Sequence, residues 1–466
     1  MYIPRWITRA ALLVCLLVLT GCQITATPAD LLLNPRSTPE NAALASAVRE
    51  QLPPRTKLSL AMQEPANSAV LQMDVDGDGK REAFVVYSDE AGTEHVMMLR
   101  SVEGTWKQWF TFAESSNYGV DVLRVADLDR DGKTELMIGW NQYGEPQHML
   151  TLYHIDLAAP FDQPPNPLVE LPYDTMGTGD ADGDGNAELA LIQLQRQKMT
   201  ASIGIYRLYG DRLDKMASAM LDGSVNEYLQ LKLGKIAPNR YGVLADAAIG
   251  ADASTTTMLA WEGGELKVIY PPMETGDDNV QINANVQLSG DGNGDGIMEL
   301  HTLREAPGQS EGVAYSDLLW IEQHKQWNGA DAFDVVNERY VDAYHSYALQ
   351  LPMSWKDYTF RRLTDGSVDD VALDRYVEET NTREEILALR VIAVADWNKT
   401  EQQLQEEGRR YMPLGSGSGL VYVAVWHDLL PKDEGEEGEQ RVAAAEGAFP
   451  PDEAELKRLF KLLPEE

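Results

Sequence analysis

Four short acidic loops of one design recur along this chain, and their spacing limits the folds open to it more than any other feature. Each loop reads Asp-x-(Asp/Asn)-x-Asp-Gly-x-x-Glu. The loops begin at Asp74, Asp127, Asp180 and Asp291. The first two intervals are both 53 residues, and the last, 111 residues, is close to twice that length. A period of this size predicts a propeller or an array of stacked units.

The doubled interval predicts a further unit that lacks an acidic loop, centred near residues 233–241. No carboxylate occurs in that segment. The residues after it still follow the pattern of the other units, with apolar stretches at 242–249, 258–261 and 266–270 and a Gly263-Gly264 turn. We therefore expect a repeat that keeps its fold and has no metal loop.

Within each unit the sequence pattern is that of β-strands. A short apolar run follows every acidic loop, as at residues 83–87, and a second run with an aromatic end comes next, as at residues 150–153. Four short strands separated by turn residues are the content of one propeller blade. The predicted fold class is therefore an all-β propeller of four-stranded blades, about five of them visible, followed by a small α+β C-terminal domain.

The acidic loops offer the hard oxygen ligands that calcium prefers. Side chains at positions 1, 3 and 5 point toward a common centre, the glycine at position 6 permits a sharp turn, position 7 offers its carbonyl oxygen, and the glutamate at position 9 closes the site. Carboxylates this close repel one another unless a cation neutralises them. The predicted ligands are Asp74, Asp76, Asp78, Lys80 and Glu82; Asp127, Asp129, Asp131, Lys133 and Glu135; Asp180, Asp182, Asp184, Asn186 and Glu188; and Asp291, Asn293, Asp295, Ile297 and Glu299.

Two other calcium motifs share this opening pattern and are excluded. An EF-hand has its closing glutamate at position 12 and helices on both sides. Position 12 here is Val85, Ile138, Leu191 or Thr302, and strands follow. Dockerin-type repeats also run into helices.

We expect about four structural Ca²⁺ ions that stiffen the turns. The alternative is that these ions take part directly in ligand binding. We expect weaker binding at the fourth loop because Asn293 replaces an aspartate.

The first residues form a targeting segment. Arg5 and Arg9 supply a positive start, and the apolar run at residues 10–19 is too short to span a bilayer as a mature helix. The segment ends in Leu-Thr-Gly-Cys at residues 19–22, which resembles the lipobox of bacterial lipoproteins. The resemblance implies cleavage before Cys22 and lipidation of Cys22, which would anchor the protein to the outer face of the bacterial cell membrane. The alternative is an ordinary signal peptide in which Cys22 is incidental.

Composition narrows the possible partners. Only Cys15 and Cys22 occur, and Cys15 lies in the segment that would be removed, so the mature chain forms no internal disulfide. The formal net charge is −35. Such a surface repels nucleic-acid phosphates and suits divalent cations or a cationic partner. We therefore expect no nucleic-acid partner.

The repeats resemble FG-GAP and VCBS repeats, the integrin-α-like blades whose inter-strand loops bind calcium. The resemblance rests on the acidic loops and on Tyr118-Gly119-Val120, which precedes the loop at Asp127 and the apolar run at residues 136–140. It covers residues 56–335 approximately. Together with the lipobox, the arrangement looks like that of lipoproteins of Gram-positive bacteria. Propellers of this family usually have more blades than the five visible here, so the resemblance leaves blade number and closure open.

Four parts are predicted along the chain. They are a lipoprotein signal peptide at residues 1–21, a lipidated linker with a short helix at 22–55, calcium-binding propeller repeats at 56–335 and a small α+β domain at 340–466. The helix at residues 40–51 is expected to pack on the propeller rim. In the last part we expect strands at 347–355, 360–363, 385–395 and 419–426 and helices at 398–410 and 452–463.

No set of catalytic residues stands out in the sequence. The seven histidines form no His-Glu-x-x-His motif. The Gly-rich stretch at residues 415–419 fails the nucleophile-elbow pattern because its central residue is Gly417, and we interpret it as a flexible turn. The tryptophans of the repeats (Trp106, Trp109, Trp140 and Trp261) could stack on sugars, but we interpret them as blade core.

The sequence favours a membrane-anchored binding or scaffolding module for an envelope protein or polysaccharide. The alternative is an envelope glycan-active or other hydrolytic enzyme, with its site on the propeller face or in the C-terminal domain. The sequence does not indicate the oligomeric state.

Overall fold

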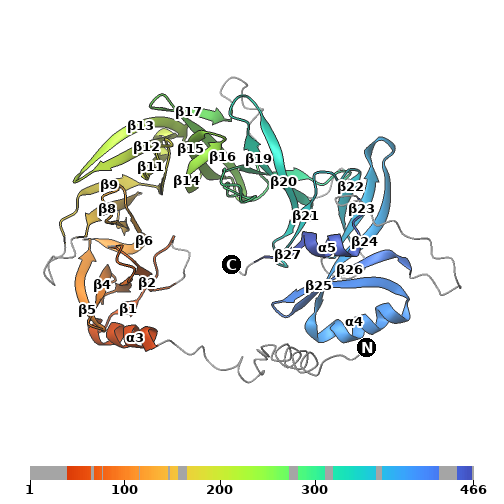
Figure 1. The fold of residues 1–466 in the computed structure, drawn as a ribbon, viewed down its shortest axis with the longest axis horizontal. Coiled ribbons are helices and arrows are strands. Elements are labelled where there is room, and N and C mark those ends of the chain that lie inside the picture. The colour runs from red at the N-terminus through yellow and green to blue at the C-terminus, as the bar shows by residue number, and fades with distance from the viewer. Residues whose placement is uncertain are drawn as a thin grey trace, which may run out of the picture.

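A computed structural model describes residues 39–63, 68–75, 77–114, 116–144, 147–155, 165–271, 282–309, 318–363, 370–429 and 449–463. Within these ranges the chain is mostly β and forms six antiparallel sheets of four or five strands. The sheets follow one another in chain order around an arc (Figure 1). This confirms the predicted β-blade fold class. The signal segment, Cys22 and Asp76 lie outside the described residues.

The first three sheets carry the first three acidic loops, which lie between the second and third strands of the first sheet and between the first and second strands of the other two. The first sheet contains β1 (Lys57–Leu58), β2 (Val70–Met73), β3 (Glu82–Ser88), β4 (Glu94–Val102) and β5 (Thr105–Ala113). The second contains β6 (Asn117–Ala126), β7 (Glu135–Gln142), β8 (His148–His154) and β9 (Val169–Tyr173). The third contains β10 (Thr175–Gly179), β11 (Glu188–Gln195), β12 (Thr200–Tyr209) and β13 (Arg212–Asp222), with the short 3₁₀ helix η1 (Arg196–Lys198) between β11 and β12.

The fourth sheet is the predicted unit without an acidic loop. It contains β14 (Glu227–Ala237), β15 (Arg240–Ile249), β16 (Ala253–Glu262) and β17 (Glu265–Tyr270). A tight turn at Pro238-Asn239, with Asn239 at φ 61°, stands where the other sheets have their loop. The strand pattern is thus kept, because the blade needs only a reversal of direction at this point, and a metal loop is one of several ways to make it.

The fifth sheet contains strands from both sides of the predicted domain boundary, and it shares a core with the sixth sheet. The fifth contains β18 (Leu300–Glu305), β19 (Trp320–Trp327), β20 (Phe333–Asp342), β21 (Tyr347–Leu351) and β27 (Phe460–Leu462). The sixth contains β22 (Tyr358–Arg362), β23 (Val371–Val377), β24 (Thr382–Ala393), β25 (Arg409–Gly417) and β26 (Leu420–Leu429), with the 3₁₀ helix η4 (Glu378–Thr380) between β23 and β24. The boundary predicted between residues 335 and 340 falls inside β20.

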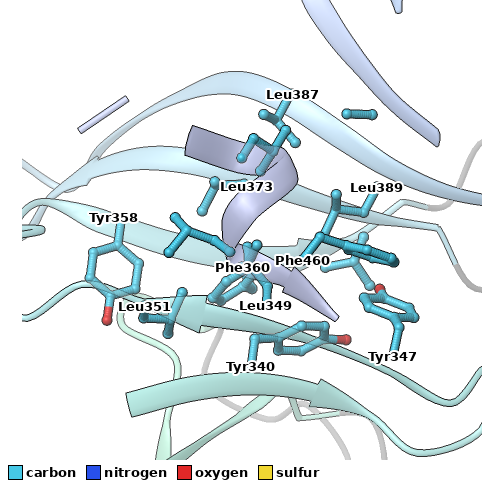
Figure 2. Close-up of a cluster of buried hydrophobic side chains, with 14 of the residues drawn as sticks. Tyr340, Tyr347, Leu349, Leu351, Tyr358, Phe360, Leu373, Leu387, Leu389 and Phe460 are labelled. Atoms are coloured by element: carbon cyan, nitrogen blue, oxygen red, sulfur yellow. The ribbon is translucent and has the colours of Figure 1, made fainter. Parts of the chain in front are cut away.

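One hydrophobic cluster joins the fifth and sixth sheets (Figure 2). Tyr340 and Leu349 come from the fifth sheet, Phe360 and Leu387 from the sixth, and all four are buried. The ring of Tyr340 stacks on that of Phe360 with centroids 4.5 Å apart. Phe460 enters the same cluster from the end of the chain. Because the core is continuous, the C-terminal part continues the series of sheets.

Two helices flank the sixth sheet and the end of the chain. α4 (Val394–Glu406) starts at once after β24, and α5 (Glu453–Leu459) leads into β27. The helix predicted at 398–410 therefore begins and ends about four residues too late. The flexible turn predicted at 415–419 is also wrong in part, since β25 continues to Gly417. Leu462 packs over Gly415 and Gly417, where any side chain would meet its methyl group.

Within each of the first four sheets, the strands are ordered from the inner side of the arc to its outer side. β2, β6 and β14 lie on its inner side, and β5, β9, β13 and β17 on its outer side (Figure 1). The second strands, such as β7, are buried along almost their whole length, because neighbouring sheets cover both faces. Apolar β-branched and aromatic residues suit such strands. Trp106, Trp109 and Trp140 are buried, as predicted for blade core.

Adjacent sheets touch most closely where the inner strands β10 and β14 meet. A Cβ atom on Gly177 would lie 2.3 Å from the carbonyl oxygen of Leu231, and one on Gly179 would lie 2.6 Å from that of Leu233. Thr175 Oγ1 donates to the carbonyl oxygen of Tyr228 at 2.5 Å. Glycine is needed here because two backbones pass within van der Waals distance.

The helix predicted near the N-terminus is α3 (Pro39–Gln51), and it packs on the first sheet at the edge of the arc (Figure 1). Leu44, Ala47 and Val48 are buried in one cluster with residues of that sheet. Gln51 Nε2 donates to the carbonyl oxygen of Trp106 at 2.9 Å. Among the described residues, no helix has the length and apolar character to cross a membrane.

Candidate metal centres and an inner groove

The four acidic loops share one backbone geometry. The carboxylate at position 1 accepts a hydrogen bond from the N–H of the glycine at position 6 in every loop. The distances are 3.0 Å for Asp74–Gly79, 3.2 Å for Asp127–Gly132, 3.0 Å for Asp180–Gly185 and 2.8 Å for Asp291–Gly296. The carboxylate at position 5 accepts from the N–H at position 7, at 2.7 or 2.8 Å. The loops are therefore preorganised by the same residues that would bind a cation.

Two positions of each loop have left-handed backbone conformations. The position 6 glycines have φ between 80° and 85°, which confirms the predicted sharp turn. Position 4 is also left-handed, with Gly77, Arg130, Gly183 and Gly294 at φ 70°, 59°, 84° and 82°. The sequence interpretation missed position 4. Glycine at this position in three of the four loops was the available signal, since few other residues adopt positive φ without strain.

The closing glutamates lie at the buried base of the loops. Glu82, Glu135, Glu188 and Glu299 are at most 3% exposed. One carboxylate oxygen of each accepts from the N–H at position 2, at 2.8 to 3.3 Å. Burial raises the pKa of Glu135 and Glu188 and raises that of Glu299 to about 7. A nearby cation would offset this cost of burying a carboxylate.

Carboxylate oxygens converge within 4.8 Å of one another in three of the loops. The groups are Asp127, Asp129 and Asp131; Asp180, Asp182 and Glu188; and Asp291, Asp295 and Glu299. In the second loop, Oδ1 of Asp127 is buried and has no hydrogen-bond partner among the described residues. These all-oxygen donor sets fit a hard divalent cation such as calcium.

Some predicted ligands have other contacts. The amide oxygen of Asn293 accepts from the N–H of Asp295 at 2.8 Å. In the first loop, Asp78 forms an exposed ion pair with Lys80 at 3.0 Å, and Asp131 lies 3.6 Å from Lys133 Nζ in the second. Lys80, Lys133, Asn186 and Ile297 each place their N–H against the position 5 carboxylate.

The residue across the sheet from each closing glutamate differs among the loops, and the sequence interpretation did not find it. Strand register pairs Glu135 with His154. The neighbouring register positions place Arg100 opposite Glu82, Arg207 opposite Glu188 and Gln326 opposite Glu299. Each lies near the other carboxylate oxygen of its glutamate, at 3.9 Å for Arg100, 3.2 Å for His154, 2.5 Å for Arg207 and 3.3 Å for Gln326.

A separate groove of about 820 Å³ lies along the inner strands β10 and β14. Its lining residues include the basic side chains Arg124, Arg196 and Lys232 and the acidic side chains Asp174 and Glu227. Asp174 is already engaged, because it accepts from Gln147 Nε2 and from the N–H of Leu194, both at 2.6 Å. Among the described residues, the groove thus has more basic than acidic side chains.

A buried polar cluster lies beside this groove. Asp121 is 3% exposed and accepts from Tyr173 Oη at 2.6 Å and from Gln63 Nε2 at 3.1 Å. His148, which lines the groove, has Nε2 3.9 Å from Asp121 Oδ1. Burial and the adjacent Asp121 carboxylate raise the pKa of Tyr173. Tyr173 is therefore a neutral hydrogen-bond donor at neutral pH.

Comparison with known proteins identifies a known type of repeat in part of the chain. Residues 74–138, which hold the first two acidic loops, match the model of an FG-GAP-like repeat. The chain therefore carries an FG-GAP-like repeat within a series of β-sheets consistent with propeller blades. No curated protein matches the chain.

Similar solved structures include two rhamnogalacturonan lyases and a post-proline cleaving enzyme. The exotype rhamnogalacturonan lyase YesX is 11% identical, with 72% of this chain and 67% of that chain covered and a TM-score of 0.28. The rhamnogalacturonan lyase PL11 of Bacillus licheniformis is 11% identical, with 71% and 68% covered and a TM-score of 0.29. A post-proline cleaving enzyme from Rickettsia typhi is 10% identical, with 70% and 48% covered and a TM-score of 0.28. Likenesses this weak say nothing about the activity of this chain.

Proposed function

We propose that this protein is a calcium-stabilised binding module, anchored by lipid at Cys22 to the outer face of the cell membrane of a Gram-positive bacterium. In this proposal its inner groove binds an anionic polysaccharide of the envelope. The acidic loops hold the blades in shape, and the groove is the ligand site.

The charge of the groove carries this proposal. Acidic residues outnumber basic residues 74 to 39 in the whole chain, yet three basic and two acidic side chains are found among the described residues that line the groove. Lys232 is exposed on β14. A local excess of positive charge on an otherwise acidic surface attracts anions to that place.

The loops support the scaffold part of the proposal. Calcium would be held in them by carboxylate oxygens and by the carbonyl oxygen at position 7, and it would neutralise the repulsion among the carboxylates. The second loop is joined to the first, because Thr134 Oγ1 donates to the carbonyl oxygen of Val75 at 2.8 Å. A cation that stiffens one loop therefore also fixes the contact between neighbouring sheets.

Binding of a polyanion tests the proposal. The mature protein in calcium should bind polygalacturonate in a salt-dependent manner and should not bind neutral dextran. Lys232→Gln with Arg196→Gln should weaken binding at least about tenfold, since each loses a charged contact. Arg212→Gln, on the outer strand β13, is the matched control. Equal affinity in the groove variant, or binding only to an envelope protein, would contradict the polysaccharide ligand.

Lipidation is tested separately. Cells that express the protein should incorporate labelled palmitate into it, and Cys22→Ser should abolish the label and release the protein into the medium. A released, unlabelled wild-type protein would show that the segment is an ordinary signal peptide.

Glycan cleavage in the same groove is a second candidate function. The observation that favours it is His148, which lines the groove beside the buried Asp121 and near the acidic Asp174. A hydrolase needs such acid and base groups within reach of the bond that is cleaved. New reducing ends that accumulate with wild-type protein but not with His148→Ala would establish this activity. Unchanged polysaccharide after prolonged incubation would leave binding alone.

A further inference from the structure

The fourth loop differs from the others in the residues just below it. In the first three repeats, the residue two positions after the closing glutamate and its cross-strand partner are both apolar. These pairs are Phe84–Met98, Met137–Leu152 and Ala190–Ile205, and all six side chains are fully buried. At the same place below the fourth loop, register pairs His301 with His324. Two imidazoles thus replace an apolar core pair.

The two imidazoles and Glu299 lie together. The rings of His301 and His324 stack with centroids 4.0 Å apart and planes 13° apart. One nitrogen of each ring and one carboxylate oxygen of Glu299 lie within 4.8 Å of one another. Glu299 forms a β-bridge with Gly290 just before β18 and precedes His301 by two residues, so both side chains face the same side of the sheet.

His324 is buried with one ring nitrogen unsatisfied among the described residues. The side chain is 1% exposed, and its Nε2 has no hydrogen-bond partner among the described residues. Its Nδ1 lies 3.0 Å from Nδ2 of Asn337, and this contact holds the ring in place. Nε2 of His301 lies 3.1 Å from the carbonyl oxygen of Gly290. A buried nitrogen without a partner is costly, and the apolar pairs of the sibling repeats avoid that cost.

We propose that Glu299, His301 and His324 bind a first-row transition-metal ion such as zinc, beside the cation of the fourth loop. Two imidazole nitrogens and one carboxylate are a frequent ligand set for zinc, and they leave a coordination position open. Calcium prefers oxygen ligands, so the histidines distinguish this site from the loop. Glu299 is shared by both groups of ligands, and its carboxylate would join the two ions.

Charged groups of both signs surround this position. Lys232 and Arg339 lie near His301, and their positive charges disfavour further positive charge there. Asp291 and Asp295 lie near Glu299, and Lys235 lies near Asp295, so three carboxylates face three basic groups. The other three loops have an apolar pair in place of the histidines, and we expect no such site there.

Cobalt absorption in the presence of calcium tests this site. Millimolar calcium fills the loops, and Co²⁺ is then titrated into the mature wild-type protein. We expect visible bands that saturate at one equivalent and disappear on addition of Zn²⁺. The double variant His301→Met with His324→Leu carries the pair of the second repeat, Met137 and Leu152, and should fold normally. Its Co²⁺ affinity should fall by at least about tenfold, while its calcium binding stays unchanged.

A second histidine provides the matched control. His95 lies 3.0 Å from Asp89 in the first sheet, and His95→Gln should keep the cobalt bands. Absence of bands in the wild type, or equal cobalt affinity in the double variant, would overturn the proposal. If the double variant does not fold, NMR of the wild type decides, because zinc must shift the imidazole resonances of both histidines and of no others.

Discussion

The guanidinium of Arg207 lies 2.5 Å from Oε1 of Glu188, the closing acid of the third loop. The same group is 2.8 Å from Asp182 and 3.0 Å from Asp184. A basic side chain of the protein thus lies among the carboxylates that would bind calcium. The equivalent residue of the fourth loop is Gln326, which has no charge. The four loops share a backbone and differ in the side chain that would compete with a bound cation.

Removal of Arg207 should strengthen calcium binding at the third loop. In Arg207→Gln, which copies the fourth loop, the carboxylates lose their internal cation and calcium has no competitor. Without metal the variant should be less stable by about 3–5 kcal/mol, because Glu188 is left buried and unpaired. Calorimetric calcium titration and chemical unfolding in chelator measure the two effects.

The control for this prediction is Arg212→Gln. Arg212 forms an exposed ion pair with Asp214 at 2.7 Å, outside the loop, and such pairs contribute little. Its calcium affinity and its stability should match those of the wild type. If Arg207→Gln binds calcium no better than this control, Arg207 is not a competitor for the site.

Removal of calcium should lower the melting temperature of the whole protein by several degrees. Each loop that binds calcium only in the folded state stabilises that state, by about 2.7 kcal/mol when free calcium is a hundredfold above its dissociation constant. Circular dichroism melts with excess chelator, and again after calcium is restored, measure this effect. Identical melting curves would show that the loops are held by their own hydrogen bonds.

The repeat was predictable because its signal is local. An acidic loop folds by contacts within nine residues, and the fixed spacing between loops located even the silent unit at 233–241. The C-terminal sheet was harder to predict. The boundary placed at 335–340 followed the end of the loop pattern, but β20 and the cluster around Tyr340 and Phe360 continue past it. The hydrophobic core continues where the loop pattern ends, so the loops alone do not mark the end of the series of sheets.

The partners of the closing glutamates could not be read from the sequence. Arg207 follows Glu188 by 19 residues, whereas Gln326 follows Glu299 by 27. The length of the hairpin between the paired strands sets this separation, and register appears only when the strands pair. For the same reason His301 and His324 looked like two of seven scattered histidines, although the sheet makes them direct neighbours.

An alanine at Gly177 should disrupt the contact between the third and fourth sheets. Its Cβ would lie 2.3 Å from the carbonyl oxygen of Leu231, so the strands β10 and β14 must separate. Overpacking of this kind costs about 1–3 kcal/mol, and it should also reduce ligand binding in the groove that these strands line. Gly417→Ala is the control, because its Cβ would meet only Leu462, at 3.6 Å. Chemical unfolding of both variants should show a loss for Gly177→Ala alone.

The histidine pair should make the metal-free protein sensitive to acid. Burial lowers the pKa of His301 to about 4 and that of His324 to about 3, whereas unfolded histidines titrate near 6.5. As the pH falls from 6.5 toward 4, the unfolded chain takes up protons that the folded chain does not, so the free energy of unfolding decreases. The slope is at most about 1.4 kcal/mol per pH unit for each histidine.

In His301→Met with His324→Leu this contribution disappears, and the difference in stability between the variant and the wild type should grow as the pH falls. Urea unfolding of demetallated protein at pH 7, 6 and 5 measures it, and a constant difference would mean that both imidazoles are protonated in the folded state as readily as in the unfolded chain.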